Sequence, residues 1–359
     1  MNFGNEIIFW YRRYKRDLPW RTSKDPYAIW LSEIILQQTR VDQGIGYYRH
    51  FLKKYPTIKK LANATEDDVL KLWQGLGYYS RARNMHQTAK EVLEKYAGIF
   101  PKEKNLLCGL KGIGEYTAAA ILSFAFNKKF PVVDGNVFRL LSRYFGIETS
   151  IGSSKAKKEF SELAETLMEN HVPSDFNQAI MEFGALQCKP MNPDCLSCPL
   201  NAGCYAYEKN KVRSLPVKKQ KQKAKSRYFH YLVIERQGKI AVNKRSENDI
   251  WKNLYDFPLI EVSKKMTSKK IMTTKPWKEF FGTTPATISS ASAWHRHLLS
   301  HQTIHAVFYN VALPIKKSLT IKDKLKFVSN KEIRKYAVPK LIENYLKESQ
   351  ELFLHANRH

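Results

Sequence analysis

Four cysteines constrain this chain more tightly than any other feature of its sequence. Cys188, Cys195, Cys198 and Cys204 lie in the segment CKPMNPDCLSCPLNAGC, with the spacing C-x6-C-x2-C-x5-C. Four thiolates that converge on one point bind a soft metal centre, either a tetrahedral zinc ion or an iron–sulfur cluster. A single CxxC pair flanked by cysteines at unequal distances favours the cluster, because zinc sites usually use two CxxC pairs.

The hydrophobic periodicity changes once along the 359 residues. Up to residue 209, apolar residues recur every three or four positions, as in TAAAILSFAF and NVFRLLSRYF, which predicts helices. Residues 211–227 hold eight Lys or Arg and no acid, which is typical of a solvated linker. We therefore predict three regions: a helical domain at 1–209, a basic linker at 210–227 and an α+β domain at 228–350.

The predicted second domain combines strands with a closing helix. YFHYLVIE, KIAVNKR, LYDFPLI and TIHAVFYN alternate between apolar and polar residues as half-buried strands do. An amphipathic pattern at 331–346 predicts a helix, and the Lys-, Thr- and Ser-rich stretch 262–287 is predicted to be a loop or insertion.

The net charge of +27 favours a polyanionic partner, with nucleic acid first and a merely basic surface as the alternative. No run approaches the roughly 18 apolar residues that a membrane span needs. The apolar patch near the start is short and broken by Glu6, so we predict no secretory signal and a cytoplasmic location, associated with the nucleoid if the source is bacterial.

The segment LKGIGEYTAAAIL places two glycines just before a predicted helix. Gly112 and Gly114 would let backbone amides at the helix start approach a phosphate closely, as a helix-hairpin-helix at about 105–128 would do. A simple tight turn between two helices is the alternative.

Glu33 lies in PYAIWLSEIILQQT, where its helical neighbours are largely apolar. Desolvation raises the pKa of a carboxyl group, which makes it a general acid at neutral pH. The alternatives are a surface glutamate or a buried one in a structural pair.

Asp134 precedes the predicted helix of VVDGNVFRLLSRYF and is, taken alone, most simply an N-cap. Together with Glu33 it fits cleavage of a glycosidic bond, in which one carboxyl protonates the leaving group and the second faces the developing cation.

These features together resemble the endonuclease III-like helix-hairpin-helix superfamily of DNA glycosylases, which are all-α proteins with a four-cysteine cluster loop. Within it the chain is most similar to the MutY family of adenine DNA glycosylases. The landmarks appear in order: LPWR at 18, PYAIWLSEIILQQT at 26, GLGYYSRARN at 75, the hairpin, VVDGNV at 132 and FNQAIMEFGA at 176.

The resemblance implies roles for individual residues. Glu33 would protonate adenine N7, and Asp134 would stabilise the sugar cation, supported by Tyr116 and Asn136. The pocket for the flipped adenine would be lined by Trp20, Arg21, Leu36 and Glu182. The loop 188–204 would carry one structural 4Fe-4S cluster on its four cysteines.

Other residues would act on the duplex. Gln38 and Tyr78 match residues that wedge beside the lesion when the base is extruded. Relatives that also cut the strand carry a lysine where this chain has Tyr116, which cannot form a Schiff base, so the resemblance implies a monofunctional enzyme that uses water. Lys111 replaces the proline usual in the hairpin turn.

The second domain resembles the Nudix-like domain of this family. The chain has no Glu-Glu pair, so we do not expect pyrophosphatase activity. Leu299, Ser300 and His301 match the family's Phe-Ser-His motif for 8-oxoguanine, with Leu299 in place of the phenylalanine.

The resemblance therefore implies a DNA base-excision repair enzyme that removes adenine opposite 8-oxoguanine, and also opposite guanine. It would act as a monomer on double-stranded DNA. The alternatives are an oxidised-pyrimidine glycosylase and lyase of the same superfamily, and a non-catalytic, cluster-bearing DNA-binding protein.

Overall fold

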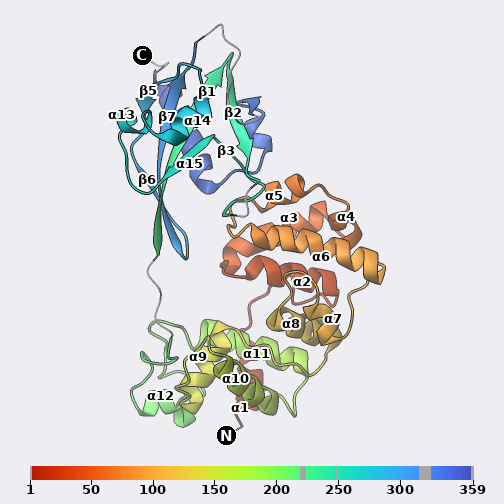
Figure 1. Ribbon diagram of the computed structural model, residues 1–359. Coiled ribbons are helices and arrows are strands. Elements are labelled where there is room, and N and C mark those ends of the chain that lie inside the picture. Colours follow the sequence, from red (N-terminus) through yellow and green to blue (C-terminus); the bar gives the residue numbers. More distant parts are fainter. Residues whose placement is uncertain (1, 219–223, 247–248, 315–324, 357–359) are drawn as a thin grey trace. The chain divides into compact units, whose positions relative to one another are not determined.

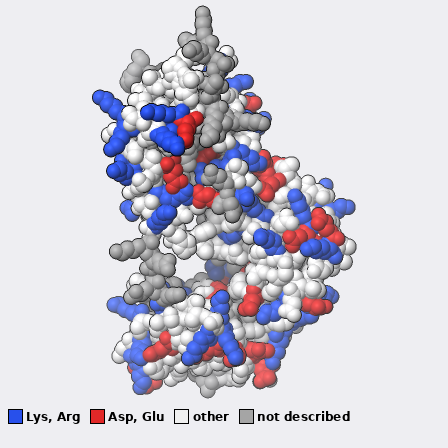
Figure 2. Space-filling model, viewed as in Figure 1, with Lys and Arg blue, Asp and Glu red and all other residues white. Residues whose placement is uncertain are grey.

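The computed structural model describes residues 2–218, 224–246, 249–314 and 325–356. It divides into two compact units: the first holds the described residues of 1–64 and 84–220, and the second those of 65–83 and 221–359. Lys and Arg side chains are spread over the visible faces of both (Figure 2). Within the described ranges, no helix combines the length and apolar content that a bilayer span requires.

The first unit is helical, as predicted (Figure 1). Its helices are α1 (Phe3–Tyr14), α2 (Pro26–Leu36), α3 (Val41–Lys54), α4 (Ile58–Ala62), most of α6 (Ser80–Tyr96), α7 (Lys104–Cys108), α8 (Glu115–Phe126), α9 (Gly135–Phe145), α10 (Ser154–Leu167), α11 (Pro173–Leu186) and α12 (Tyr205–Glu208), with the short 3-10 helix η1 (Asn201–Gly203).

Local sequence signals set the ends of the helices that matter for function. Asp25 caps α2 by accepting from the Tyr27 amide at 3.0 Å, and Pro26 occupies the first turn, where its missing N–H costs nothing. Asp134 caps α9, and Gly146 ends it in the left-handed region. These caps fix where Glu33 and Asp134 project from their helices.

Two apolar clusters hold the helices of this unit together. The larger joins α1, α9, α10 and α11 around buried rings that include Phe160, Phe176 and Phe183. The smaller packs Ile29 of α2 against Ala119, Ala120 and Phe124 of α8. Because α2, α8, α9 and α11 are fixed in these clusters, the side chains that they present to a common cavity are held on rigid elements.

The second unit contains a mixed sheet, which within the described residues has eight strands. The order is β3-β2-β1-β7-β5, with β4 beside β1, β6 beside β7 and β8 beside β2, and only the β1–β7 pair is parallel. The strands are β1 (Lys225–Arg236), β2 (Lys239–Lys244), β3 (Tyr255–Asp256), β4 (Leu259–Val262), β5 (Thr287–Ala291), β6 (His295–Leu298), β7 (Gln302–Ala312) and β8 (Lys326–Ser329).

Each face of this sheet has its own apolar core, because side chains alternate along a strand. One face packs on α15 (Lys340–Ala356) through Leu341 and Ile342. The other packs on α13 (Ser268–Ile271) and α14 (Lys275–Phe281). The closing helix thus begins at Lys340, later than the predicted 331, and Ile333–Lys335 form the 3-10 helix η2.

The stretch 262–287 was predicted to be a loop or an insertion, and the loop alternative is wrong because the stretch contains α13 and α14. Thr267 caps α13, Thr274 caps α14, and Trp277 and Phe281 are buried. These short helices escape a periodicity search because lysines surround their few apolar residues.

Two further segments bear on the predicted boundaries. Leu215 is buried on the helical unit, where its carbonyl accepts from the Arg143 guanidinium at 3.1 Å, and β1 begins at Lys225, inside the predicted linker. The second unit also contains residues 65–83, with α5 (Glu66–Trp73), although they belong to the helical part of the sequence.

Candidate active site

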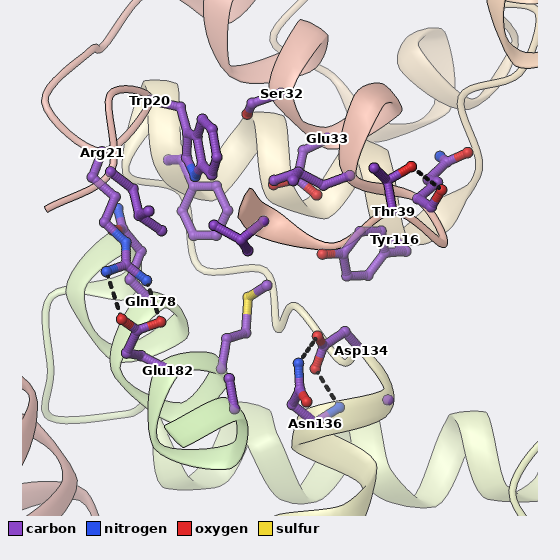
Figure 3. A pocket seen from close by; sticks show the side chains of 18 of the residues that line it. Trp20, Arg21, Ser32, Glu33, Thr39, Tyr116, Asp134, Asn136, Gln178 and Glu182 are labelled. Atoms are coloured by element: carbon purple, nitrogen blue, oxygen red, sulfur yellow. Dashed lines mark hydrogen bonds and ion pairs between the residues drawn. The ribbon is translucent and has the colours of Figure 1, made fainter. Parts of the chain in front are cut away.

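A cavity of about 510 Å³ opens in the helical unit between α2, α8, α9 and α11. Figure 3 shows Glu33 on one wall, Asp134 and Asn136 on the facing wall, and Tyr116 between them. The predicted pocket residues Trp20, Arg21, Leu36 and Glu182 also line it, and so does Gln38, which was predicted to wedge beside the lesion. The volume lies within the range of roughly 300–1,000 Å³ that is usual for small-molecule sites.

Glu33 is 8% exposed, and its carboxyl group is desolvated among the apolar residues of α2 and α8. Burial raises its pKa to about 7, the nearby charge of Asp134 acts in the same direction, and a hydrogen bond from the Tyr116 hydroxyl opposes the rise. The carboxyl group is therefore protonated in a substantial fraction of molecules at neutral pH and can donate a proton.

Asp134 faces Glu33 from the N-terminus of α9. Its Oδ1 accepts from the backbone amides of Asn136 and Val137, both at 2.8 Å, and its Oδ2 accepts from Asn136 Nδ2 at 2.7 Å. Burial raises the pKa of Asp134, while these hydrogen bonds lower it by favouring the ionised form. The N-cap interpretation is confirmed, and the same bonds fix the carboxylate toward the cavity.

Arg139 holds the side chain of Asn136 in place by a hydrogen bond to its amide oxygen. Its Nη2 donates to Asn136 Oδ1 at 2.8 Å and to the Gly184 carbonyl at 2.6 Å, and its Nε donates to the Cys188 carbonyl at 2.7 Å. The amide of Asn136 is thereby oriented so that its nitrogen faces Asp134.

Glu182 is a second buried carboxylate in the same cavity, but its environment is the reverse of that of Glu33. Burial would raise its pKa, yet hydrogen bonds and charge from Arg16 and Arg21 lower the pKa to about 2. Each guanidinium donates to both carboxylate oxygens, over distances of 2.7–3.0 Å. Glu182 therefore stays ionised and cannot act as an acid.

Several residues that line this cavity were not predicted from the sequence. Arg16 lies in the run YRRYKRD, which looks like a solvated basic helix end. Gln178 accepts a hydrogen bond from the Tyr11 hydroxyl at 2.9 Å through Oε1. The motif FNQAIMEFGA contained Gln178, four residues before Glu182, so the helical period could have placed both on one face of α11.

The predicted hairpin lies before α8. Gly112 has φ +78°, and a Cβ there would meet Asn84 Cβ at 2.8 Å, so both conformation and space require glycine. Gly114 caps α8 without a side chain, and nothing lies within 4 Å of its virtual Cβ. The start of α8 is thus open to an approaching anion.

The four predicted cysteine ligands line one cavity, with Leu140 and Arg143 of α9 on its wall. They are not disulfide-bonded. Arg143 Nη1 lies 3.4 Å from Cys188 Sγ, and burial together with the other thiols raises the pKa of Cys195, Cys198 and Cys204. In the described part of the chain, no three His, Cys, Asp or Glu side chains are spaced to hold a single metal ion.

A second cavity, of about 570 Å³, lies within the second unit. Tyr78, Ser300 and His301 line it, and the hydroxyls of Tyr78 and Ser300 contact each other. Leu299 and Trp251 complete the apolar part of the wall. The structure thus brings together the predicted wedge residue Tyr78 and both predicted lesion-reading residues, whereas Gln38 lines the first cavity.

The loop that carries Tyr78 is held by its neighbours. Tyr78 has φ +46° and follows Gly77 at φ +71°. The Gly77 carbonyl accepts from Trp73 Nε1 at 3.0 Å and from Arg81 Nη2 at 3.3 Å. The Arg81 guanidinium also lies over the rings of Trp73 and Tyr78, and Tyr78 remains 44% exposed. An aromatic ring is thus presented to solvent on a fixed loop.

Comparison with known proteins identifies both halves. Residues 31–166 match the HhH-GPD superfamily of base excision DNA repair proteins, and residues 230–348 match the NUDIX domain. An adenine DNA glycosylase of Buchnera aphidicola subsp. Schizaphis graminum is 37% identical over 310 residues, which cover 85% of this chain and 86% of the relative. The chain belongs to the adenine DNA glycosylase family.

A second relative and a solved structure are also similar to this chain. The human enzyme is 41% identical over 216 residues, which cover 58% of this chain and 40% of the relative. A solved structure described as a thermostable thymine-DNA glycosylase matches with a TM-score of 0.54 and 33% identity, over 58% of this chain and 95% of that one. The predicted fold class, a helix-hairpin-helix glycosylase domain followed by a Nudix-like domain, is confirmed.

Proposed function

We propose that this glycosylase removes adenine paired with 8-oxoguanine, by hydrolysis and without cutting the strand. The observation that carries the proposal is the pair of carboxyl groups across one cavity: Glu33, with its pKa raised to about 7, and Asp134, held by three hydrogen bonds. An acid and a carboxylate placed on opposite sides of a leaving group are what hydrolysis of an N-glycosidic bond requires.

Glu33 acts as the acid. Its proton passes to N7 of the extruded adenine, the C1′–N9 bond breaks, and the bonding electrons leave with the base. The negative charge of Asp134 then stabilises the cationic sugar, with Asn136 fixing its orientation. Water adds to C1′, and a carboxylate of the pair accepts its proton. Tyr116 donates its hydroxyl hydrogen bond to Glu33 and fixes the direction of the acid.

The remaining cavity residues bind the base. Trp20 offers a ring, which is itself held edge-on by Tyr48 at 5.3 Å. Leu36 supplies apolar contact. Arg21 and Glu182 form a largely buried ion pair in the wall of the cavity, so the pocket keeps its shape when the duplex releases the base into it.

Tyr116 supports the monofunctional mechanism. Burial raises its pKa well above the usual value, so the hydroxyl stays neutral, and it has no amine to form a Schiff base. The product would be an intact strand with an abasic site.

The second cavity would read the partner base. Tyr78 would insert its ring where stacking is lost, and Ser300 and His301 would address the altered edge of 8-oxoguanine with a hydroxyl and an imidazole. Leu299 would supply the apolar contact. Backbone amides beside Gly112 and Gly114 would hold a phosphate at the start of α8.

The 4Fe-4S cluster would be held by Cys188, Cys195, Cys198 and Cys204, and the proposal is supported by the four thiols lining one cavity. Four thiolates around a single zinc ion at about 2.3 Å would lie about 3.8 Å apart, which is closer than a larger cluster needs. When bound, the cluster would supply a rigid cross-link for this loop.

A single-turnover assay with a panel of duplexes tests the proposal. We expect fast release of adenine opposite 8-oxoguanine, slower release opposite guanine, and none from A:T or from an oxidised pyrimidine. Release from the oxidised-pyrimidine duplex alone would favour the lyase relatives, and tight binding without release from any duplex would favour a non-catalytic DNA-binding protein.

A further inference from the structure

β6 and β7 form an antiparallel hairpin, and β7 also pairs with β1 (Figure 1). On the face that packs on α15, Arg227 of β1 is neutralised, because its Nη2 lies 2.6 Å from carboxylate oxygens of both Asp249 and Glu261. On the opposite face, Lys265 and Arg296 are exposed, and within the described ranges neither has an ion-pair partner.

The strand register places this second face in one row. Tyr228 of β1 pairs with His305 of β7, and His305 pairs with Arg296 of β6. The rings of Tyr228 and His305 stack at 5.0 Å and 14°. Burial, followed by the charges of Lys265 and Arg296, lowers the pKa of His305, so both cations act at this imidazole.

Lys265 comes from the segment after β4 and is fixed beside the row. Its Nζ lies 5.1 Å from the centroid of the Trp294 ring, which meets His230 edge-on at 5.3 Å. Lys265 is thus held over an aromatic ring, and Arg296 is held on strand β6. We call Tyr228, Lys265, Arg296 and His305 the basic hairpin face.

We propose that the basic hairpin face binds the phosphodiester backbone of the DNA whose damaged base is read at the hairpin tip. Lys265 and Arg296 would neutralise phosphates, while the stacked pair of Tyr228 and His305 offers a ring to sugar or base. Phosphate contacts of this kind fix the register of a protein on a duplex without reading its sequence.

The position of the face argues for DNA as the partner, and this step depends on the proposed function. Ser300 lies four residues after Arg296, and at about 3.3 Å per residue the two lie within roughly 13 Å along the hairpin. Because duplex DNA carries one charge per roughly 1.7 Å of its axis, a duplex held at the tip brings several phosphates within this length.

The test compares two charge-matched double variants of the full chain. Lys265→Ala/Arg296→Ala removes the proposed contacts. Arg236→Ala/Lys239→Ala is the control, which also removes one arginine and one lysine. Both residues are exposed and are register partners where β1 ends and β2 begins. Arg236 lies eight residues, or roughly 26 Å, along β1 from Tyr228. Fluorescence anisotropy measures binding to an A:8-oxoguanine duplex whose adenosine carries a 2′-fluoro group that blocks loss of the base.

For the hairpin variant we expect the slope of log K against log salt to become shallower by about 1.8, since each phosphate contact contributes about 0.9. The control variant and a charge-conserving Lys265→Arg/Arg296→Lys variant should keep the wild-type slope. An unchanged slope in the hairpin variant, or an equal change in the control, would overturn the proposal.

Adenine release separates this inference from the proposed function. If the wild type releases adenine but the hairpin variant keeps its salt slope, only the inference about the face fails. If the wild type releases no adenine, the proposed function fails whatever the slopes are. A third outcome concerns specificity. Suppose that the wild type releases adenine, that the salt slope of the hairpin variant changes, and that an acidic polypeptide competes with the duplex equally well in the hairpin and control variants. The face is then specific for DNA.

Discussion

The two cavities have similar volumes, about 510 and 570 Å³, but they hold their polar groups in opposite ways. In the helical unit, the groups that matter are buried carboxyls: Glu33 is 8% and Glu182 is 1% exposed. In the second unit, Ser300 and His301 are exposed, and so is Tyr78. The two cavities thus have similar volumes, but the first is lined by buried carboxyl groups and the second by exposed polar side chains.

This difference matches two different tasks. Proton transfer needs a pKa near the working pH, and burial supplies the shift for Glu33. Recognition of a base within a duplex needs donors and rings that reach outward. Glu33 and Glu182 show that burial alone does not decide the outcome, because two arginines reverse its effect on Glu182.

The largest expected effect is on the rate of adenine release, and binding of the duplex should hardly change. Glu33→Gln removes the proton donor while keeping its shape, and we expect the single-turnover rate of adenine release to fall by about 10²–10⁴-fold. Binding to the mismatched duplex should stay within a few-fold of wild type. Glu94→Gln, an exposed glutamate on α6, serves as the control. A Glu33→Gln rate near that of the control would remove Glu33 from the mechanism.

The next effect concerns the ion pairs of the first cavity. Glu182→Gln leaves Arg16 and Arg21 without their shared carboxylate, and we expect a loss of on the order of 3 kcal/mol in the free energy of unfolding. Glu162→Gln, which breaks an exposed pair with Lys158 at 3.8 Å, should cost less than about 0.5 kcal/mol. Chemical denaturation measures both. Equal costs would show that the buried pair does not hold the cavity.

The pH dependence sharpens the distinction between the two carboxyls. The active form of Glu33 is protonated and its pKa is raised to about 7. The rate constant for adenine release should therefore be highest below pH 7 and fall about tenfold per unit above it. The same profile measured with Glu33→Gln should lack this decline. A wild-type rate that stays constant from well below to well above pH 7 would contradict the assignment.

The smallest effect concerns the second cavity. Ser300→Ala removes a hydroxyl proposed to contact the oxidised base, and we expect the preference for A:8-oxoguanine over A:G to fall by about 0.5–1.5 kcal/mol, or roughly 2- to 12-fold. The rate on A:G should hardly change. Ser289→Ala on β5 is the matched control. An equal loss on both duplexes would place Ser300 outside lesion recognition.

Much of this arrangement could be predicted from local sequence signals. Periodicity predicted the helical first unit and the strands of the second, and an acid in an apolar helical pattern predicted the buried Glu33. The N-cap position of Asp134 was equally visible, because an aspartate before a helix has a defined geometry.

Other features depend on contacts that no local pattern contains. Tyr78 and Ser300 are 222 positions apart, so only the fold brings their hydroxyls together. Arg16 belongs to a basic run whose partner, Glu182, lies 166 positions away. Helices α13 and α14 form because the sheet buries Trp277 and Phe281, which a search for longer periodic segments does not register.

One measurement tests the central claim most directly. An A:8-oxoguanine duplex is incubated with excess enzyme, and free adenine and strand breaks are quantified before and after hot alkali. We predict one adenine per duplex, with breaks appearing only after alkali. Strand breaks without alkali, or no free adenine, would contradict the assignment of Glu33 and Asp134 as the acid and carboxylate of a monofunctional hydrolysis.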